Sequence, residues 1–331
     1  LDMLDTAGAI TDHGKAARDL GIHPRLAHMV LKGRAIGLEG PAAALAALLE
    51  ERDLLGSGAG ADMHERIRVF YGERRDRTLD AARLKALRQS ARRLAGPAAT
   101  DAPMPSETEA GRLLALAYPD RIARRRPGKA PRYQLSNGKG AALREDDPLA
   151  RHEWLVAAEL DGRAREATIY LAAPVDIPDL ESDLADHIHE TEEALWDEGQ
   201  GKIIAREVRK LGELVLQEKP IAQVDPELVQ QGLINAIRKK GLASLPWTDD
   251  SLQWRARVRL LAGSFPDDGW PDTSDVALLE NLEHWLGPFL AGMNRWSDLA
   301  RIDLLQALNS LLDYPDQQQL QALAPTHLTI P

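Results

Sequence analysis

Seven basic side chains are concentrated in residues 117–140, AYPDRIARRRPGKAPRYQLSNGKG. Asp120 is the only acid in this stretch, although the whole chain carries a formal charge of −10. Arginine binds phosphate oxygens with two parallel hydrogen bonds, and lysine binds them as a point charge. The stretch therefore has the chemistry to hold a polyanion. The alternative, which the sequence leaves open, is a basic surface loop that balances acidic parts of the same protein.

The candidate contacts in this stretch are chosen by residue type and by their expected place on strands beside a glycine-containing turn. Phosphates are predicted to be bound by Arg124, Arg125, Arg126, Lys129, Arg132 and Lys139. Tyr133 is expected to offer a ring on which a base could stack. Lys85, Arg88 and Arg92 form a basic stripe at helical spacing and are secondary candidates, although a solvated basic helix face is the simpler interpretation.

Charge is distributed unevenly along the chain. Residues 1–150 contain 25 Lys and Arg against 20 Asp and Glu, a net charge of +5, and the remaining residues carry −15. Because a polyanion is attracted to positive surface, we expect a nucleic-acid partner to meet the first half of the chain.

Motifs for other kinds of chemistry are absent or weak. The sequence contains no G-x-x-x-x-G-K-[ST] loop for nucleoside triphosphates and no G-x-S-x-G nucleophile turn. GSGAG at 56–60 follows a predicted helix rather than a strand, which indicates a linker. DEGQ at 197–200 has no apolar strand immediately before it and is interpreted as a hairpin turn.

The best metal candidate is HIHETEE at 187–193. His187 and His189, two residues apart, would share one side of a strand and could bind a divalent ion together with a carboxylate. A metal hydrolase would also need a third placed ligand and an open position. The flanking sequence is rich in Asp and Glu, so we favour an exposed acidic linker and predict no metal site.

The elements that must position the basic stretch change character along the chain. Residues 1–104 are predicted to be helical, with one helix beginning at Pro41. Ser106 and Glu109 form a capping box for a helix that stops at Pro119. Residues 120–175 then alternate apolar and polar positions around turns, which predicts short strands. Segment 202–217 fits a helix or strands, and we favour strands because its surroundings are β.

Helices are predicted again from Asp225 onward. Asp225 and Pro226 begin a helix that ends at Gly241. One helix is expected from Ser274 to Phe289, and another from Ser297 to about Leu312. The final sequence, APTHLTIP, has β character and is expected to be a strand whose partners lie elsewhere.

The composition indicates a folded protein of a reducing compartment. The chain has no cysteine, no apolar run near the ~18 residues that a membrane helix needs, and no basic n-region of a signal peptide. The cytoplasm is therefore the expected location, and no membrane partner is expected. Because the sequence begins without Met, we expect it to be part of a longer protein.

Several segments resemble DEAH-box helicases. LDTAGAITDHGKAARDLGIHPRLAHMVL at 4–31 is similar to the segment that joins their winged-helix and ratchet domains, with Ile22 in place of the usual Leu. The bacterial HrpB branch of that family is resembled by LLALAYPDRIARRR (113–126), YQLSNGKGAAL (133–143), DPLARHEWLVAAELD (147–161), LPWTD (245–249) and LAPTHLTIP (323–331). The segments also occur in the family's order, and the resemblance extends over nearly the whole chain, from residue 4 to residue 331.

The resemblance implies an α+β multidomain fold with a helical ratchet-like bundle, an OB-like small β-barrel and a C-terminal helical extension. The implied divisions are the end of a winged-helix segment (1–20), the bundle (21–104), the OB-like domain (105–222) and the helical domain (223–331). No catalytic residue of the family falls within this sequence.

The function that the resemblance implies is non-catalytic. Such a region would line the path of single-stranded RNA, with DNA as the alternative, and would organise or regulate the RecA-like motor domains of the same polypeptide. ATP and Mg²⁺ are implied only for those motor domains, and no cofactor is implied here. The alternative is a protein-interaction scaffold that uses the acidic half, whose tryptophans include Trp270 as the expected exposed anchor.

Overall fold

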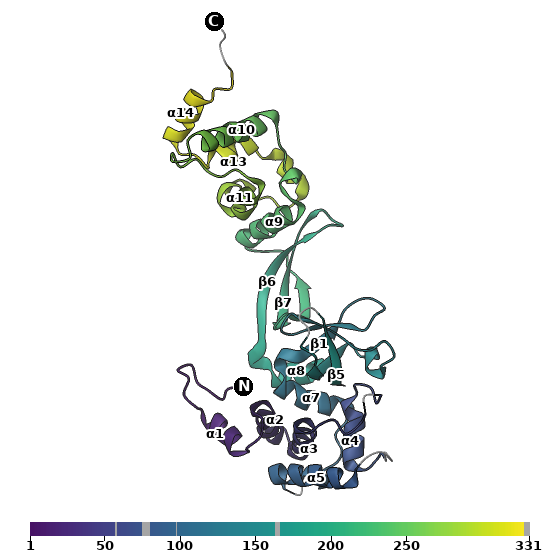
Figure 1. The fold of residues 1–331 in the computed structure, drawn as a ribbon. Helices are drawn as coiled ribbons and strands as arrows, with labels where there is room; N and C mark the ends of the chain where they lie inside the picture. The colour runs from purple at the N-terminus through teal and green to yellow at the C-terminus, as the bar shows by residue number, and fades with distance from the viewer. Residues whose placement is uncertain (57, 75–79, 97, 163–165, 328–331) are drawn as a thin grey trace. The chain divides into compact units, whose positions relative to one another are not determined.

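The computed structural model describes residues 1–331 except 57, 75–79, 97, 163–165 and 328–331 (Figure 1). It divides into two compact units. The first comprises residues 1–189 and 209–216, and the second comprises residues 190–208 and 217–331. None of the described helices is long and apolar enough to cross a membrane.

The first unit begins with a helical layer whose centre is α3 (Glu39–Glu50). Around it lie α2 (Pro24–Ala35), α4 (Met63–Tyr71), α5 (Ala81–Ala95), α6 (Ala98–Asp101) and α7 (Glu107–Ala117), and α1 (Asp12–Asp19) packs against α2. Small side chains let these helices approach closely, since a Cβ added at Gly33 of α2 would lie 2.7 Å from the Ala42 Cβ of α3. α3 begins at Glu39, two residues before the predicted start at Pro41.

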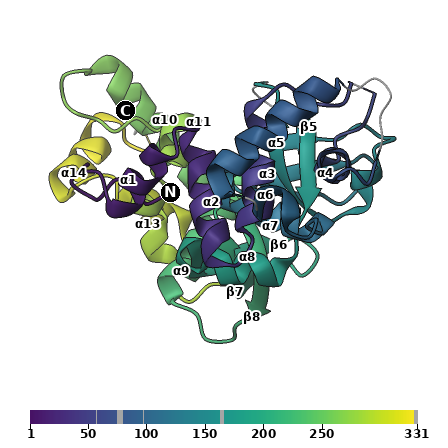
Figure 2. The same cartoon turned by 90° about the horizontal axis from the view of Figure 1, so that it is seen from below.

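The predicted capping box at the start of α7 is confirmed. The Ser106 hydroxyl accepts a hydrogen bond from the Glu109 N–H, and the Glu109 carboxylate accepts one from the Ser106 N–H. α7 packs against the barrel strand β5 (Glu166–Pro174), and the two lie together in Figure 2. The approach requires Gly111, where an added Cβ would lie 1.9 Å from the Pro174 carbonyl oxygen. Helical layer and barrel therefore share one unit.

The β-rich segment after α7 forms a closed five-stranded barrel. Its strands are β1 (Ile122–Arg125), β2 (Arg132–Leu135), β3 (Gly140–Ala142), β4 (Trp154–Leu160) and β5, in the order β1-β2-β3-β5-β4. All neighbours are antiparallel except β3 and β5, which are parallel. The predicted strands in 120–175 are confirmed.

The barrel strands contribute to two different cores because neighbouring residues point to opposite faces. Ala123, Tyr133, Leu135 and Leu155 belong to the interior core of the barrel. Ile122, Trp154 and Val156 have the opposite parity and belong to the core shared with the helical layer and with Leu211 and Leu214. The outer face of β1 and β4 is therefore covered at one end and open at the other, where Arg124 lies.

After α8 (Ile177–Asp183), a second sheet has the order β6-β7-β8, formed by β6 (Ile188–Asp197), β7 (Lys202–Leu211) and β8 (Leu214–Pro220). The prediction of strands in 202–217 is confirmed, as is the turn at DEGQ. The division into units runs through this sheet, and residues 209–216, at the β7–β8 turn, belong to the first unit.

The second unit is otherwise helical, with α9 (Pro226–Lys240), α10 (Asp249–Ser264), α11 (Asp275–Glu280), α12 (Leu282–Trp285), α13 (Leu304–Asn309) and α14 (Tyr314–Leu323). The predicted α9 is confirmed. The single helix expected from Ser274 to Phe289 is wrong: it is divided into α11, α12 and a 3₁₀ turn containing Pro288, which lacks an N–H for a helix interior.

The second expected long helix is also divided. Residues 296–301 form a 3₁₀ helix, and α13 begins anew because the Asp303 carboxylate caps it through the Gln306 N–H. The predicted C-terminal strand lies partly outside the described residues, and the described part after α14 ends without one. The four domains expected from the sequence, with their three boundaries, stay predictions.

Candidate nucleic-acid interface

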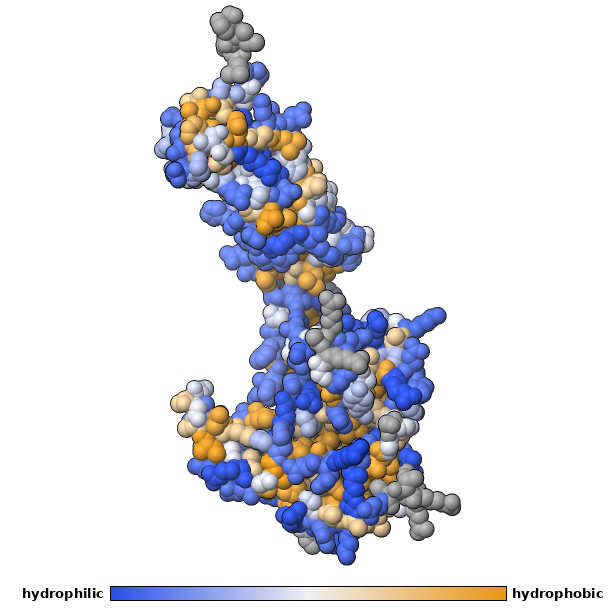
Figure 3. Space-filling view, in the orientation of Figure 1, coloured by the Kyte–Doolittle hydropathy of each residue, from blue (hydrophilic) through white to orange (hydrophobic). Residues whose placement is uncertain are grey.

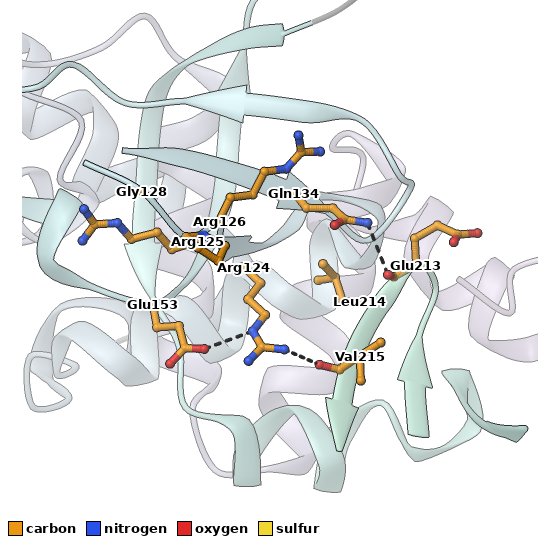
Figure 4. A pocket seen from close by; sticks show the side chains of 10 residues that line it. Arg124, Arg125, Arg126, Gly128, Gln134, Glu153, Glu213, Leu214 and Val215 are labelled. Carbon is orange, nitrogen blue, oxygen red and sulfur yellow. Dashed lines mark hydrogen bonds and ion pairs between the residues drawn. The ribbon is translucent and has the colours of Figure 1, made fainter. Parts of the chain in front are cut away.

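A hollow of about 580 Å³ lies on the outer face of the barrel (Figure 4). All of its residues belong to the first unit. They are Arg124, Arg125, Arg126, Pro127, Gly128, Gln134, Glu153, Glu213, Leu214 and Val215. The hollow thus collects the three consecutive arginines of the basic stretch with residues from two distant segments.

Strand register explains which side chains meet here. Arg124 of β1 lies opposite Gln134 of β2 and opposite Trp154 of β4. Directly opposed residues share a face of the sheet, so these three form one row across the outside of the barrel. Trp154 is buried beside the arginine, and Gln134 is half-buried.

Arg124 is held on three sides. Its Nε donates to the Glu153 carboxylate at 3.0 Å, and its Nη1 donates to the Val215 carbonyl at 2.8 Å. The guanidinium carbon lies 5.2 Å from the centre of the Trp154 ring, a cation–π distance. The side chain nevertheless remains 42% exposed, so it is oriented by the protein and still accessible.

Arg125 and Arg126 leave the strand in different directions (Figure 4). Arg125 has the inward parity of Tyr133, and its Nη1 donates to the Ala150 carbonyl at 2.6 Å. Arg126 is exposed, and its backbone N–H pairs with the Arg132 carbonyl. Arg126 is thus the arginine of the three most open to an anion.

The far wall of the hollow comes from the β7–β8 turn, which sequence reasoning missed. The Glu213 N–H donates to the Ser136 carbonyl at 2.8 Å, and the Gln134 amide donates to the Glu213 carbonyl at 3.4 Å. Gly212 permits the contact, because its φ is +57° and an added Cβ would lie 2.2 Å from the Ser136 oxygen. In the sequence, Gly212 is the only signal for this contact between the β7–β8 turn and Ser136.

Tyr133 cannot stack on a base in this structure, so that expectation is wrong. The side chain is fully buried inside the barrel, and its hydroxyl donates to the His152 carbonyl at 3.0 Å. Burial raises the pKa of this hydroxyl to about 12. The physical reason is parity, since Tyr133 shares the face of Leu135.

The other candidates of the basic stretch do not line the hollow. Arg132, on β2, forms an ion pair with Glu166 at 3.3 Å and stays 62% exposed. Lys129, in the β1–β2 loop, and Lys139, in the β2–β3 turn, are exposed. The three residues are exposed on separate loops and strands of the barrel and do not complete a single site with the hollow.

The secondary stripe on α5 is separate from the hollow. Arg88 is half-buried and donates to the Phe70 carbonyl at 2.8 Å through its Nε. Arg92 donates to the Thr100 hydroxyl at 2.9 Å, and Lys85 is exposed. Two of these three cations therefore support local packing.

The metal candidate is not assembled. His187 ends a 3₁₀ helix and His189 lies on β6, so the two do not share one side of a strand as expected. Both are exposed. Within the part of the chain that the structure describes, no three His, Asp or Glu residues are placed to hold a metal ion.

The tryptophans of the acidic half mostly face inward. Trp254 and Trp285 are buried in the core of the second unit. Trp270, the expected exposed anchor, is half-buried and packs against that core. The expectation for Trp270 is therefore not supported. The exposed hydrophobic residues of this unit include Leu252 and Leu260 on α10, Val276 on α11 and Leu323 on α14. Figure 3 shows orange hydrophobic patches on the surface of this unit.

Two family models match the chain. One, described as "ATP-dependent RNA helicase HrpB, connector region", matches residues 187–221, which contain the second sheet. The other, described as "ATP-dependent helicase C-terminal", matches residues 285–331. The first match includes the β7–β8 turn that forms the wall of the hollow.

Known proteins similar to the chain are considerably longer. The ATP-dependent RNA helicase HrpB of Escherichia coli K12 is 35% identical over 324 residues, which is 97% of this chain and 38% of that protein. The crystal structure of the E. coli DExH-box NTPase HrpB is 34% identical, with a TM-score of 0.55 over 99% of this chain and 39% of that one. The crystal structure of the E. coli DEAH/RHA helicase HrpB is 30% identical, with a TM-score of 0.57 over 100% and 40%.

Proposed function

Since this chain belongs to the HrpB family of ATP-dependent RNA helicases, we propose that it is a non-catalytic accessory region that lines a single-stranded nucleic-acid path. Its other proposed task is to organise or regulate RecA-like motor domains of the same polypeptide. ATP and Mg²⁺ would act in those domains, and we propose the cytoplasm as the location. RNA is the proposed substrate because the E. coli K12 relative is named an ATP-dependent RNA helicase.

The observation that carries the proposal is the meeting of Arg124, Arg125 and Arg126 at one hollow on the barrel. Consecutive strand residues normally point to opposite faces, but these three lie at the end of β1, where the strand leaves the barrel. An oriented arginine beside an exposed one can follow a flexible phosphate backbone. The net positive charge of residues 1–150 supports the same partner.

The architecture supports a single strand rather than a duplex. We propose that the closed five-stranded barrel is OB-like, a class of small barrel that binds oligonucleotides on its outer strands and loops. The hollow lies on that outer face, beside the β1–β2 loop. It is bordered by Glu153 and Glu213, so a strand would be held locally rather than along a continuous basic surface.

The proposal is tested by titrating labelled oligo-U with the 331-residue chain at several salt concentrations. Each phosphate contact on a single strand contributes about 0.7 to the slope of log affinity against log salt, so an Arg124/Arg125/Arg126→Ala variant should lose up to about 2. A matched control replaces three exposed arginines of the same unit, Arg18, Arg52 and Arg93, with alanine. Equal affinities and equal slopes for wild type and the first variant would contradict the assignment.

The protein-interaction role of the second unit is retained as a second candidate. It is favoured by exposed Leu252 and Leu260, eight residues apart and hence on one face of α10, at 48% and 62% exposure. A Leu252→Glu/Leu260→Glu variant should then lose association with the separately produced motor domains. Unchanged association would remove this candidate.

A further inference from the structure

The guanidinium of Arg124 is fixed in one plane. Its Nε and Nη1 groups already donate within that plane to Glu153 and to the Val215 carbonyl. The guanidinium carbon lies 5.2 Å from the centre of the Trp154 ring, which supports the group from the protein side. A planar guanidinium held in this way is pre-organised for stacking, because little further conformational entropy is lost when a ligand binds.

The same contacts leave Arg124 less free than Arg126 to bind a phosphate. A phosphate bound in bidentate fashion at the Nε edge would have to displace the Glu153 carboxylate, which lies 3.0 Å from Nε and is 58% exposed. That carboxylate also repels an approaching anion. Arg125 and Arg126, one and two residues further along, are not engaged by a carboxylate among the described residues. The three arginines therefore offer two different kinds of contact.

The hollow in front of Arg124 has the size and lining for a planar heterocycle. Its volume of about 580 Å³ lies within the range of small-molecule sites, ~300–1,000 Å³. Gln134 stands beside Arg124 in the cross-strand row, with its amide nitrogen donating to the Glu213 carbonyl and its amide oxygen available as an acceptor. Stacking on an arginine plane with amide groups at the edge is how proteins hold unpaired bases.

We propose that Arg124, backed by Trp154, is a stacking platform for one unpaired nucleobase, and that Arg125 and Arg126 hold the neighbouring phosphates. This inference rests on the proposed function and sharpens it. A base within a duplex is covered by its neighbours and cannot reach the platform. The site therefore selects single strands by their accessible bases. Base stacking, which the sequence predicted for Tyr133, is proposed instead for Arg124, supported by Trp154.

The test compares two probes of equal charge, a labelled 12-nucleotide oligo-U and a 12-unit abasic oligonucleotide with the same backbone. Wild type should bind oligo-U about tenfold more tightly than the abasic probe, as one stacked base contributes ~1–3 kcal/mol. Arg124→Lys keeps the charge and removes the plane, so it should lose that preference with an unchanged salt slope. Arg126→Lys is the matched control and should keep the preference.

A second variant guards against misfolding of the first. Arg124→Met keeps a long side chain on Trp154 but has no planar cation, and it should also lose the preference for bases. Retention of the preference by both Arg124 variants would overturn the platform while leaving the proposed function intact. Absence of salt-dependent binding of either probe to wild type would instead overturn the proposed function, and the platform with it.

Discussion

Arg25 of α2 and Asp120 of the segment before β1 form an ion pair that joins the helical layer to the barrel. The Arg25 Nη2 donates to the Asp120 Oδ2 at 3.3 Å, and its Nη1 donates to the Ala117 carbonyl at 3.2 Å. The guanidinium carbons of Arg25 and Arg121 lie 5.5 and 4.7 Å from the centre of the Tyr118 ring. Two segments that carry the family resemblance, HPRLA and YPDRI, are thus in direct contact.

The ion pair predicts a pH-dependent contribution to stability. Partial burial alone would raise the pKa of Asp120, but the hydrogen bond and charge of Arg25 outweigh it and hold the pKa below its ordinary value. Stability from this pair is therefore present above pH 4 and is lost as the pH falls through the lowered pKa. Asp120→Asn should cost on the order of 1 kcal/mol at pH 7, discounted because Asp120 is 41% exposed.

Urea unfolding of the first unit at pH 7 and pH 3 measures this effect. Asp19→Asn provides the control, because the Arg18–Asp19 pair is 68% exposed on both sides and should contribute almost nothing. Equal losses for the two variants at pH 7 would contradict a special role for the Arg25–Asp120 pair.

Gly111 predicts a large packing effect between α7 and β5. Replacing it with alanine places a Cβ 1.9 Å from the Pro174 carbonyl oxygen, so backbone has to move. We expect Gly111→Ala to destabilise the first unit by about 3 kcal/mol, the upper part of the range for overpacking. Gly56→Ala, where an added Cβ meets no atom within 4 Å, should change thermal stability by less than about 1 kcal/mol. A Gly111→Ala variant as stable as wild type would show that the helix and barrel are packed differently.

The His13–His28 pair predicts loss of stability in mild acid. The His13 Nε2 lies 2.8 Å from the His28 Nδ1. Burial, with a smaller contribution from His13, lowers the pKa of His28 to about 4. The unfolded chain binds the proton first, so stability should fall as the pH drops from about 6.5 towards 4, by on the order of 2 kcal/mol.

Thermal unfolding between pH 7.5 and 5 of wild type, His28→Gln and His284→Gln checks this prediction. His284 is exposed and serves as the control. His28→Gln should flatten the pH dependence of the unfolding midpoint, whereas His284→Gln should leave it unchanged. Identical pH profiles for all three proteins would be inconsistent with a buried neutral pair.

Gly212 predicts that the β7–β8 turn shapes the nucleic-acid hollow. In Gly212→Ala the new Cβ would clash with the Ser136 oxygen at 2.2 Å, which should displace residues 213–215 and weaken oligo-U binding at least several-fold. Gly201→Ala is a matched control, since its φ of +60° resembles the +57° of Gly212 but no atom lies within 4 Å of its added Cβ. Oligo-U affinities are measured by fluorescence titration. Equal affinities for the two variants would show that the β7–β8 turn does not shape the binding surface.

Local rules predicted the elements of the fold more successfully than the composition of the site. The Ser106 capping box and the α9 boundaries depend on short-range patterns and were confirmed. The strands in 202–217, which were predicted from their β surroundings because the local pattern was ambiguous, were also confirmed. Tyr133 was misassigned even though its parity with Leu135 already placed it on the apolar face of β2. The prediction for Tyr133 relied on its aromatic ring and did not use its position in the strand.

The wall of the hollow could not be predicted from the sequence. Val215 meets Arg124 through a backbone carbonyl, and a backbone acceptor leaves no signature in residue type. The contact spans 91 positions of sequence and depends on the close approach that Gly212 permits. The divisions of the two long C-terminal helices were missed for a different reason. Pro288 and the Asp303 cap are local signals, but the continuous helical periodicity was given more weight.

Locating the bound strand tests most directly whether nucleic acid binds at the hollow on the barrel. A 4-thiouridine oligonucleotide is photo-crosslinked to the 331-residue chain, and the modified peptides are identified by mass spectrometry. Crosslinks should fall on residues 124–128, 134, 153–154 and 213–215, which line or border the hollow, and excess unlabelled oligo-U should suppress them. Crosslinks confined to α5 or to the second unit, with none at the hollow, would contradict the proposed nucleic-acid path.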